Sequence, residues 1–391
     1  MTASAERPVA LVITRNLPPL IGGMERLVWH IVDELRADYR VHVIGPGGCA
    51  RHLPADVNAT EIPLKPMFRY LLRTKLAAIG QALRLRPTLV FAGSGLTAPF
   101  AWLAARLTGA RCISYLHGLD IEARHPIYRL LWRPFQRRCD RVLVNSHFTQ
   151  QLAIEAGIDS ERIAILHPGV ALPDTSQADK LGTEFRARHA LGDAPLMLYV
   201  GRITTRKGLA AFVQNILPII VDRHPTAKVI VIGDEPTQAL HHQTGERQRI
   251  QQALTDKKLQ DKLLFLHDVD DASLQAAYFA ADVLIFPVQD LPNDHEGFGM
   301  VAIEAAAHGL PTVAFAVGGV VDAIKNRHSG NLVSPGDMAA FAQNVIALLA
   351  VTPPERSAWA NTARTFAAKF AWPNFGRRLI HLCQRSEVES P

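Results

Sequence analysis

The chain reads Leu-Met-Leu-Tyr-Val-Gly-Arg-Ile-Thr-Thr-Arg-Lys-Gly from Leu196 to Gly208. The five apolar or aromatic residues at its start predict a strand over Leu196–Val200 that ends at Gly201. A polar turn with three cations follows and leads into a helix. A strand that passes through such a turn into a helix is the building unit of a parallel α/β sheet, and this stretch therefore predicts that fold class.

The same alternation extends outward along the whole chain. Val229–Ile232 and Val283–Phe286 are continuously apolar, as parallel strands buried on both faces are. In Met24–Leu35 the apolar residues Leu27 and Ile31 recur at helical spacing. Further strands are predicted at Val9–Thr14, Tyr39–Ile44, Thr88–Ala92, Arg111–Leu116, Arg141–Asn145, Ile163–Leu166, Lys228–Ile232, Leu263–Leu266, Pro311–Ala316 and Asn331–Val333. We therefore predict an α/β protein of two Rossmann-like, doubly wound parallel-sheet domains.

The length of 391 residues is about twice that of one domain, which favours two. The stretch from Pro168 to Gly192 is the most linker-like part of the chain. We place the domains at residues 1–172 and 173–371, with a final helix at 372–391 that crosses back onto the first. The segment from Thr352 onward is expected to be helical and interrupted by prolines. Two open sheets joined in this way are expected to face each other across a cleft, where ligands bind.

Composition is typical of a soluble globular protein, with 48% hydrophobic and 20% charged residues. The apolar run Val9–Ile13 is too short for a signal-peptide core, and no uncharged apolar stretch reaches about 18 residues, so we expect neither an export signal nor a spanning helix. Cys49, Cys112, Cys139 and Cys383 are widely spaced and are expected to be reduced thiols of a cytoplasmic protein. The net charge of +6 suits nucleic acid, anionic lipid or a phosphorylated small molecule.

The segment Glu296-Gly297-Phe298-Gly299-Met300-Val301-Ala302-Ile303-Glu304 carries the strongest chemical signal. The residues from Met300 to His308 are expected to be helical. Eight residues span slightly more than two turns, so Glu296 and Glu304 are predicted near one helix face. The two glycines before the helix would leave backbone N–H groups open to a ligand. A surface pair of glutamates is the alternative, but the apolar neighbours of Glu304 argue against it.

Two further segments suit phosphate binding. Arg202 and Lys207 follow the strand that ends at Gly201 and could clamp a diphosphate, although basic surface loops are also common. Gly22 and Gly23 follow the first predicted strand and open a helix, where bare amides can approach phosphate oxygens. The pattern lacks the spacing of a GxGxxG motif, so a nicotinamide cofactor is not favoured.

These segments, in this order, resemble the retaining glycosyltransferases of family 4, which have the GT-B fold. The resemblance covers nearly the whole chain. The tail is similar to the kinked final helix of that family. The matching pieces are Gly22-Gly23, His117-Gly118-Leu119-Asp120, Asn145-Ser146, Pro168-Gly169-Val170, Gly201-Arg202, Lys207-Gly208, the pair Glu296 and Glu304, and Phe370-Ala371-Trp372.

The resemblance implies a role for each site residue. Arg202 and Lys207 would hold the donor diphosphate, and Glu304 would accept hydrogen bonds from the ribose. Glu296 would hold the transferred sugar. The resemblance implies that the amides of Phe298 and Gly299 also contact the sugar, and that those of Met300 and Val301 contact the distal phosphate. Gly23 would complete this phosphate site from the first domain. His117, with Asp120 nearby, would contact the sugar near its C6 hydroxyl. For His117 the alternative is a buried histidine that only satisfies its own hydrogen bonds.

The resemblance also implies a mechanism without a protein nucleophile, in which the departing phosphate takes the acceptor proton. A retaining hydrolase needs two carboxylates about 5 Å apart, whereas a helical rise would separate Glu296 and Glu304 by about 12 Å. We expect no cofactor and no metal. Asp268-Val269-Asp270 resembles a DxD metal motif, but Asp270 or Asp271 is expected to cap the following helix. His241-His242 has no partner at ligand spacing and is expected at the surface.

Acceptor contacts are expected from the first domain. The segment 65–86 carries basic residues among apolar and aromatic ones, and it suits either an anionic membrane surface or a solvated helix face. Its residues are Lys65, Met67, Phe68, Arg69, Tyr70, Leu71, Leu72, Arg73, Lys75, Arg84 and Arg86. A second basic stretch suits an acceptor phosphate or solvent, and consists of Arg124, His125, Arg129, Arg133, Arg137 and Arg138.

We therefore expect a hexosyltransferase that uses a nucleotide-diphosphate sugar to extend a glycan or lipid-linked acceptor, in cell-surface polysaccharide, lipopolysaccharide or glycolipid synthesis. The loop Gln289–His295 resembles that of mannosyltransferases that use GDP-mannose, although enzymes that use UDP-sugars carry similar loops. We expect a cytoplasmic protein, peripheral at the inner face of the plasma membrane. The alternatives are a nucleotide-sugar epimerase, which needs no acceptor, and a periplasmic sugar-binding protein, which needs an export signal. Nucleic acid is not expected as a partner, because no aromatic stacking pattern accompanies the positive charge.

Overall fold

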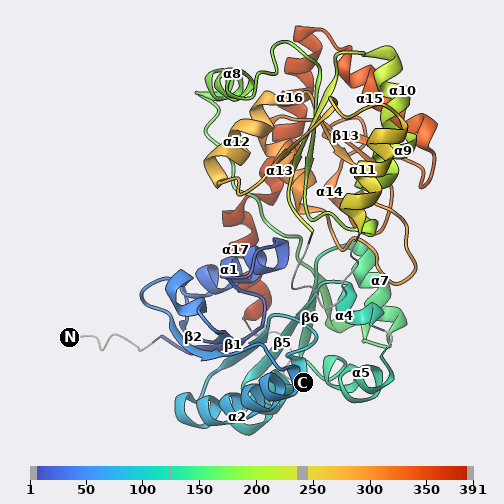
Figure 1. Ribbon diagram of the computed structural model, residues 1–391. Helices are drawn as coiled ribbons and strands as arrows, with labels where there is room; N and C mark the ends of the chain where they lie inside the picture. The colour runs from blue at the N-terminus through green and yellow to red at the C-terminus, as the bar shows by residue number, and fades with distance from the viewer. Residues whose placement is uncertain (1–6, 124, 236–244, 385–391) are drawn as a thin grey trace. The chain divides into compact units, whose positions relative to one another are not determined.

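The computed structural model describes residues 7–123, 125–235 and 245–384. The contacts divide the chain into two compact units, one running to Gly169 and taking in the segment from Trp372 onward, the other spanning Val170–Ala371. The division falls three residues before the boundary predicted at residue 172. Each unit has its own parallel sheet covered by helices (Figure 1).

The sheet of the first unit is entirely parallel, in the order β3-β2-β1-β4-β5-β6-β7. Its strands are β1 (Val9–Ile13), β2 (Arg40–Pro46), β3 (Asn58–Ile62), β4 (Leu89–Ala92), β5 (Arg111–Leu116), β6 (Arg141–Val144) and β7 (Ile163–Ile165). Its helices are α1 (Gly23–Leu35), α2 (Met67–Leu85), α3 (Ala98–Thr108), α4 (Leu119–Glu122), α5 (Pro126–Leu131), α6 (Arg133–Gln136), α7 (His147–Glu155) and α17 (Trp372–Cys383), with a 3₁₀ turn at Cys49–His52. The chain reverses direction across the sheet between β1 and β4, which is the switch point where such sheets bind ligands.

The strand β3 is absent from the sequence prediction. It lies at the edge of the sheet, and of its five residues only Ile62 is buried. An edge strand with this exposure lacks the continuous apolar run by which the central strands are recognised. The predicted strands of this unit are otherwise present, with ends that shift by up to two residues.

The sheet of the second unit is also parallel, in the order β10-β9-β8-β11-β12-β13. Its strands are β8 (Leu196–Val200), β9 (Lys228–Ile232), β10 (Leu263–Leu266), β11 (Val283–Phe286), β12 (Thr312–Phe315) and β13 (Gly330–Val333). Its helices are α8 (Ala178–Arg188), α9 (Leu209–Asn215), α10 (Leu217–Arg223), α11 (Glu246–Asp256), α12 (Asp271–Ala280), α13 (Met300–His308), α14 (Val320–Ala323), α15 (Met338–Leu349) and α16 (Pro353–Ala367), with 3₁₀ turns at Thr205–Lys207 and Ala368–Phe370. Here the switch point lies between β8 and β11.

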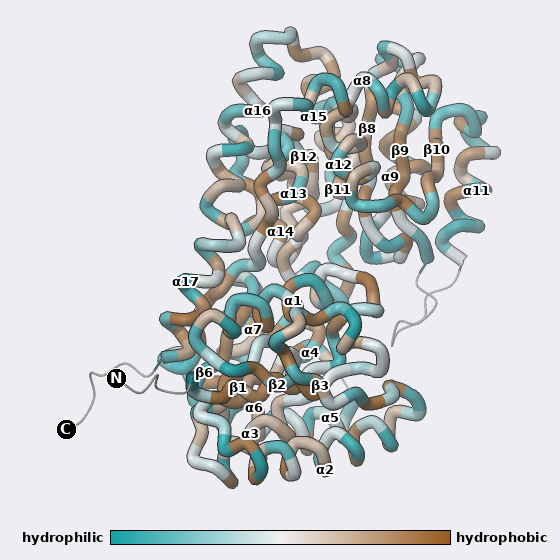
Figure 2. Tube along the Cα trace, turned by 90° about the vertical axis from the view of Figure 1, so that its left-hand side faces the viewer, coloured by the Kyte–Doolittle hydropathy of each residue, from teal (hydrophilic) through white to brown (hydrophobic). Residues whose placement is uncertain are grey.

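Apolar side chains of the strands form the cores of both units, and Figure 2 shows the strands as hydrophobic stretches inside each unit. The four strands β8 to β11 have the predicted bounds, because each is a short and mostly apolar run. The fold class predicted from the sequence is confirmed in the two parallel-sheet Rossmann-like units.

Two parts of the sequence interpretation are wrong. The stretch from Pro168 to Gly192 is not merely a linker, because it contains α8, which buries Phe185 against the α12 side of the second unit. The prolines near the C-terminus do not interrupt helices. Pro353 stands in the first turn of α16, and Pro373 follows the first residue of α17, positions where a missing N–H group costs little.

The final helix α17 packs against α1 within the first unit. Trp372 stacks on His30 with ring centroids 3.5 Å apart, and Phe375 and Leu379 are buried. No helix among the described residues has both the length and the apolar character needed to cross a bilayer.

Candidate functional site

The loops that follow β8 and β11 meet at the switch point of the second sheet. The backbone N–H of Gln289 donates to the carbonyl of Arg206 at 2.7 Å. Gly208 has φ +73°, and a Cβ atom there would lie 1.9 Å from the carbonyl oxygen of Pro287. Only glycine permits both this conformation and this close approach. The local fold therefore fixes the cationic turn against the loop that leads to Glu296.

A cluster of buried charges lies where these loops meet. Lys207 Nζ is 2.8 Å from Glu296 Oε2, and Arg206 Nη1 hydrogen bonds to the same carboxylate oxygen. Arg206 also pairs through Nε with Asp294 Oδ1 at 3.1 Å. The side chains of Arg206, Lys207 and Glu296 are only 8%, 11% and 13% exposed. A buried charge is tolerated only when it is paired in this way.

The charges of the cluster change the pKa values of Glu296 and Lys207. Burial by itself would raise the pKa of Glu296, but the positive charges of Arg206 and Lys207 outweigh it and lower that pKa to about 2. Burial lowers the pKa of Lys207, and the carboxylate of Glu296 opposes that effect. Glu296 is thus held as a carboxylate at neutral pH, with two cations fixed around it.

The structure separates the cations of this turn into two kinds. Arg206 and Lys207 are buried, whereas Arg202 is exposed at the end of β8. The carbonyl of Arg202 accepts a hydrogen bond from the Tyr199 hydroxyl at 3.1 Å. The sequence interpretation missed Arg206, because its pairing with Glu296 joins residues 90 positions apart. Gly201, just before Arg202, has φ +144° and open space around it.

The prediction that Glu296 and Glu304 lie on one helix face is wrong. Gly299 adopts φ +90° and is the N-cap of α13, so Glu296 precedes the helix instead of belonging to it. Glu296 is held by its backbone, since its carbonyl accepts from the Gly319 N–H at 2.8 Å. Helical spacing therefore does not apply to the pair.

The start of α13 leaves backbone donors available. The first N–H groups of a helix, here those of Met300 and Val301, have no intrahelical acceptor. Gly299 stands at the N-cap and has no side chain that could accept from them. A Cβ atom at Gly299 would lie 2.8 Å from the ring of Phe286. The neighbouring Phe298 is buried, and Gly297 is partly exposed. The positive end of the helix dipole adds to this donor set.

Glu304 lies further along α13 and is 8% exposed. The Tyr278 hydroxyl of α12 donates to Glu304 Oε2 at 3.0 Å. The Tyr278 ring stacks on His308 with centroids 4.8 Å apart. A carboxylate offers about four lone-pair positions, so Glu304 can accept hydrogen bonds from more than one donor.

In the first unit, the glycines after β1 lie beside an acid that the sequence interpretation missed. Glu25 is 8% exposed and accepts a hydrogen bond from Asn16 Nδ2 at 3.0 Å. A Cβ atom at Gly22 would lie 2.4 Å from the Glu25 carboxylate, so this acid folds back on the start of its own helix. Gly23 is exposed. Glu25 thus stabilises the positive end of α1.

His117 and Asp120 lie at the carboxyl end of β5. His117 is 6% exposed, and its Nε2 hydrogen bonds to the carbonyl of Gly93 at 2.9 Å. Asp120 Oδ2 accepts from the backbone N–H of His117 at 3.2 Å. One ring nitrogen of His117 is therefore hydrogen bonded within the first unit, as expected for a buried histidine with a structural role. Asp120 orients the turn that carries His117.

The second basic stretch is largely structural. Arg133 Nη2 donates to the Ile121 carbonyl at 2.7 Å, and Arg137 Nε donates to the Ala156 carbonyl at 2.9 Å. Arg138 lies over the ring of Trp102, 5.7 Å from its centroid. Arg129 is exposed, and Arg124 lies outside the described residues. Most of these arginines hold the fold of the first unit together.

The other sequence expectations concern metals and thiols. Asp270 caps α12, because its Oδ1 accepts from the Ser273 N–H at 2.8 Å, and this confirms the capping interpretation of the DxD-like segment. His241 and His242 lie outside the described residues. The four cysteines are free and buried, and the sulfur atoms of Cys112 and Cys139 are 3.5 Å apart.

Both halves of the chain match the models of known protein families. Residues 183–366 match the model of glycosyl transferases group 1, and residues 21–172 match that of glycosyltransferase family 4. The chain is 26% identical, over 95% of its length and 97% of the relative, to the GDP-mannose-dependent alpha-(1-6)-phosphatidylinositol monomannoside mannosyltransferase of Mycolicibacterium smegmatis. It is 28% identical to a D-inositol 3-phosphate glycosyltransferase of Corynebacterium urealyticum, over 83% of this chain and 80% of that one.

Solved structures show the same fold. A glycosyltransferase from Rickettsia africae superposes with a TM-score of 0.80 at 19% identity, over 98% of this chain and all of that one. The Anabaena protein HepE in complex with UDP gives a TM-score of 0.77 at 19% identity, over 96% and 98% of the two chains. The two family models match the two units in turn, and full-length relatives are named glycosyltransferases. The chain therefore belongs to glycosyltransferase family 4, with the group 1 domain in its second half, and it is a glycosyltransferase of the GT-B fold.

Proposed function

We propose that this protein transfers mannose from GDP-mannose to a glycan or a lipid-linked acceptor, with retention of the anomeric configuration. One observation carries the donor assignment. The carboxylate of Glu296 is neutralised by Arg206 and Lys207 at the switch point, directly before a helix whose first N–H groups have no intrahelical acceptor. Cations and amides around one buried acid suit a ligand that carries both phosphates and hydroxyl groups.

Each residue has a proposed task. Arg202 and Lys207 neutralise the diphosphate, and the N–H groups of Met300 and Val301 donate to its distal phosphate. The charge on that phosphate grows as the bond to the sugar breaks, so donors fixed beforehand stabilise the transition state more than the ground state. Glu304 accepts from the ribose hydroxyls. Glu296, with the N–H groups of Phe298 and Gly299, holds the hydroxyls of the sugar. His117 of the first unit also contacts the sugar.

The proposed reaction needs no covalent enzyme intermediate. The bond from the sugar C1 to the phosphate oxygen breaks, and the acceptor oxygen bonds to C1 on the same face. The acceptor proton passes to the departing phosphate oxygen, which becomes basic as the bond breaks. Arg206 then has an indirect task, because it keeps Glu296 ionised and in place while Lys207 turns to the phosphate.

Mannose and GDP are proposed because the full-length relative from Mycolicibacterium smegmatis is named as GDP-mannose-dependent. The acidic loop Gln289–His295 before Glu296 is consistent with that choice. A phosphate-bearing acceptor is proposed because the relatives are named for phosphatidylinositol mannoside and inositol 3-phosphate. The solved HepE complexes contain UDP and UDP-glucose, so UDP-glucose is the competing donor to test.

Calorimetric titration with GDP, UDP, GDP-mannose and UDP-glucose tests the donor site. We expect GDP-mannose to bind more tightly than UDP-glucose. Arg202→Ala and Glu304→Ala should each weaken nucleotide binding by about tenfold or more, the loss expected for a hydrogen bond to a charged group. Arg223→Ala removes an exposed cation at the end of α10 and is the matched control. Unchanged affinity in both site variants would show that the assignment is wrong.

Product analysis tests the stereochemistry and the need for an acceptor. The α-linked donor should give an α-linked product in the proton NMR spectrum of the new linkage. A β-linked product would exclude retention. Conversion of the sugar in the absence of any acceptor would instead support the epimerase alternative.

We also propose that the first unit docks on anionic membrane lipid. Segment 65–86 holds six cations and no acidic residue. Phe68, Leu72, Leu76 and Leu83 of α2 are each more than half exposed, and their spacing places them on one side of the helix. An apolar stripe beside cations, on a helix without an acid, is complementary to a negatively charged lipid surface.

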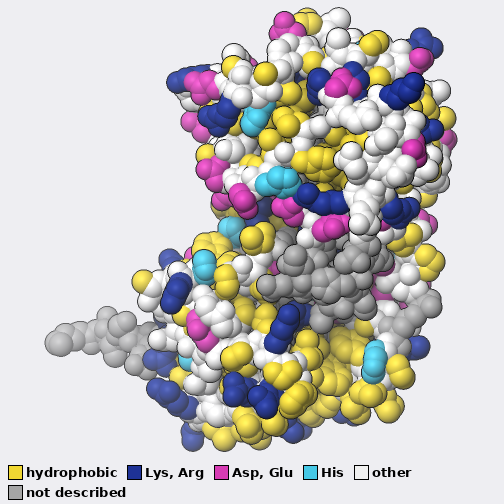
Figure 3. Space-filling view, viewed as in Figure 1, with side chains coloured by type: hydrophobic (Ala, Val, Ile, Leu, Met, Phe, Trp, Pro, Cys, Tyr) yellow, Lys and Arg dark blue, Asp and Glu magenta, His cyan; other side chains and the backbone are white. Residues whose placement is uncertain are grey.

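The short helix α5 adds to this surface. Ile127, Leu130 and Leu131 are also more than half exposed, and Arg129 lies among them. Figure 3 shows hydrophobic and basic side chains gathered over the region of α2 and α5. These exposed apolar residues of α2 and α5 together form what we call the lipid-facing set.

Sedimentation with vesicles tests this docking. The protein should bind vesicles that contain phosphatidylglycerol and should bind pure phosphatidylcholine far less, and added salt should weaken the binding. Within the lipid-facing set, Leu72→Asp with Leu76→Asp should release the protein, whereas Ile219→Asp, at an exposed apolar residue of α10, should not. Equal binding of all variants, or none at low salt, would contradict the proposal.

A further inference from the structure

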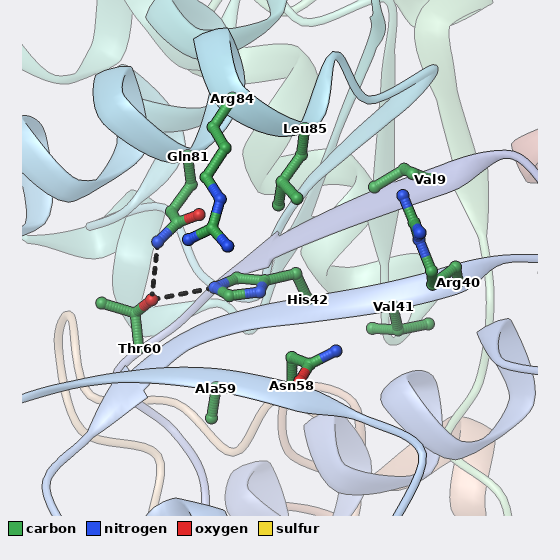
Figure 4. Close-up of a pocket in the computed structure, with 10 residues that line it drawn as sticks. All are labelled: Val9, Arg40, Val41, His42, Asn58, Ala59, Thr60, Gln81, Arg84 and Leu85. Carbon is green, nitrogen blue, oxygen red and sulfur yellow. Dashed lines mark hydrogen bonds between the residues drawn. The ribbon is translucent and has the colours of Figure 1, made fainter.

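A pocket of about 430 Å³ lies at the amino ends of β1, β2 and β3. This is the end of the first sheet opposite to the one that carries Gly23 and His117. The last turns of α2 cover it (Figure 4). Its polar lining consists of Arg40, His42, Asn58, Thr60, Gln81 and Arg84.

The sheet face beneath α2 changes character at this pocket. Ile44 and Ile62 are buried in the core under the helix. Two residues earlier on the same strands, and on the same face because side chains alternate, stand His42 and Thr60. The pocket is therefore polar where a continued core would be apolar.

The polar groups of the pocket form a partial network. His42 Nε2 and Thr60 Oγ1 are 2.8 Å apart, and Gln81 Nε2 donates to Thr60 Oγ1 at 3.2 Å. Gln81 Oε1 is buried and has no hydrogen-bond partner among the described residues. A buried acceptor without a donor is costly, and a ligand hydroxyl would satisfy it.

The charge of the pocket has one sign. Figure 4 shows Arg84 reaching from α2 toward His42, and Arg40 extending from β2 toward Val9. No acidic residue is among the ten that line the pocket, and neither guanidinium forms an ion pair with any residue in the described ranges. Burial, together with the charge of Arg84, lowers the pKa of His42, so its ring is neutral at pH 7.

We propose that this pocket binds a phosphate monoester that carries hydroxyl groups, such as a sugar phosphate. Arg40 and Arg84 hold the phosphate, and Gln81 Oε1 and the Asn58 amide take the hydroxyls. The volume is within the range of about 300–1,000 Å³ that small-molecule sites occupy. The site is separate from the donor site proposed above, whose phosphate-binding residues belong to the second unit and whose His117 lies at the opposite end of the first sheet.

The phosphate can belong to a free metabolite or to a lipid headgroup. The probes are therefore glucose 6-phosphate, inorganic phosphate, glucose, and vesicles that contain phosphatidic acid. The readout is the imidazole NMR signal of His42, identified by its absence in His42→Gln. A bound anion favours the imidazolium form, so glucose 6-phosphate should raise the pKa of His42, and glucose should not.

Arg40→Ala and Arg84→Ala should each weaken glucose 6-phosphate binding about tenfold, because each removes a charge-assisted contact. Arg51→Ala, which removes an exposed arginine of the same unit outside the pocket, should leave it unchanged. A response to phosphatidic acid vesicles alone would support the site and assign its phosphate to lipid. No response of the His42 signal to any phosphate, or equal losses in all three variants, would overturn the proposal.

The donor-site proposal is tested separately in the same protein. Arg202→Ala should retain the His42 response to glucose 6-phosphate. Arg84→Ala should retain the nucleotide affinity measured by calorimetry. Failure of either proposal therefore leaves the other one intact.

Discussion

At the scale of single residues, the charge state of Glu296 is the feature with the largest consequence. Its carboxylate is shared by Arg206 and Lys207, and its pKa falls from 4.5 to about 2. A lowered folded-state pKa stabilises the protein above the unfolded-state pKa, and this contribution disappears as the pH falls from about 4.5 toward 2. The shift corresponds to about 3 kcal/mol at neutral pH.

The prediction is that Glu296→Gln lowers the free energy of unfolding at pH 7 by about 3 kcal/mol, since it leaves two buried cations without their counterion. The difference between wild type and variant should shrink below pH 4.5 and vanish near pH 2. Urea unfolding of both proteins at several pH values measures it. A difference that stays constant with pH would contradict the assigned pKa shift.

The sequence singled out some residues of this cluster and missed others. Lys207 and Glu296 stand in recognisable local motifs, and the structure brings them into contact. Arg206 was missed because nothing local distinguishes a buried arginine from an exposed one in a polar turn. Glu25 was missed for the same reason, as its burial depends on Asn16 folding over it.

At the scale of elements, the close approach of the loops after β8 and β11 decides whether the charged cluster can assemble. Gly208 and Gly192 both have positive φ, but only at Gly208 would an added Cβ atom meet a carbonyl, 1.9 Å from the oxygen of Pro287. Alanine at Gly192 should therefore cost about 1–2 kcal/mol from the left-handed backbone alone. Alanine at Gly208 should lower the free energy of unfolding by more than this, because the Pro287 carbonyl has to move. For the same reason it should also weaken donor binding.

Thermal unfolding and nucleotide titration of Gly208→Ala and Gly192→Ala measure this difference. The comparison separates backbone strain, which both variants share, from the displacement of a loop, which only one suffers. Equal losses of stability with unchanged nucleotide affinity in both would refute the close contact.

Sequence patterns predicted apolar elements better than polar ones. The strands β8 to β11 are short apolar runs between turn residues, so their bounds follow from the sequence. The strand β3 lies at a sheet edge with a single buried residue, and α8 follows a stretch rich in Pro, Asp and Ser, so neither has an unambiguous pattern. The bounds of α13 match the predicted helix over Met300–His308, but the direction of the chain before it depends on the backbone angle of Gly299, which no periodicity reveals.

At the scale of the whole molecule, the first unit is built from two separate pieces of chain. The segment from Trp372 belongs to it by contact, and Phe375 and Leu379 bury their side chains there. The second unit is continuous and has its own core. Removing the last segment should therefore harm only one of the two units.

The prediction is that a chain ending at Ala371 loses several kcal/mol of stability in the first unit, since two large apolar side chains and a stacked tryptophan are removed. The second unit should keep its unfolding temperature and its nucleotide affinity. Calorimetry, with nucleotide present to mark the second unit, can tell the two transitions apart. A single transition that shifts as one would contradict independent cores.

The discontinuous first unit also has a consequence for synthesis on the ribosome. About 370 residues must leave the exit tunnel before Trp372 can reach His30. The second unit leaves the ribosome complete before α17 does. The first unit, although most of it is translated first, therefore finishes folding last. Until α17 has left the tunnel, the nascent chain exposes the surface of α1 that α17 will cover, and a chaperone that binds apolar helix faces would find it there.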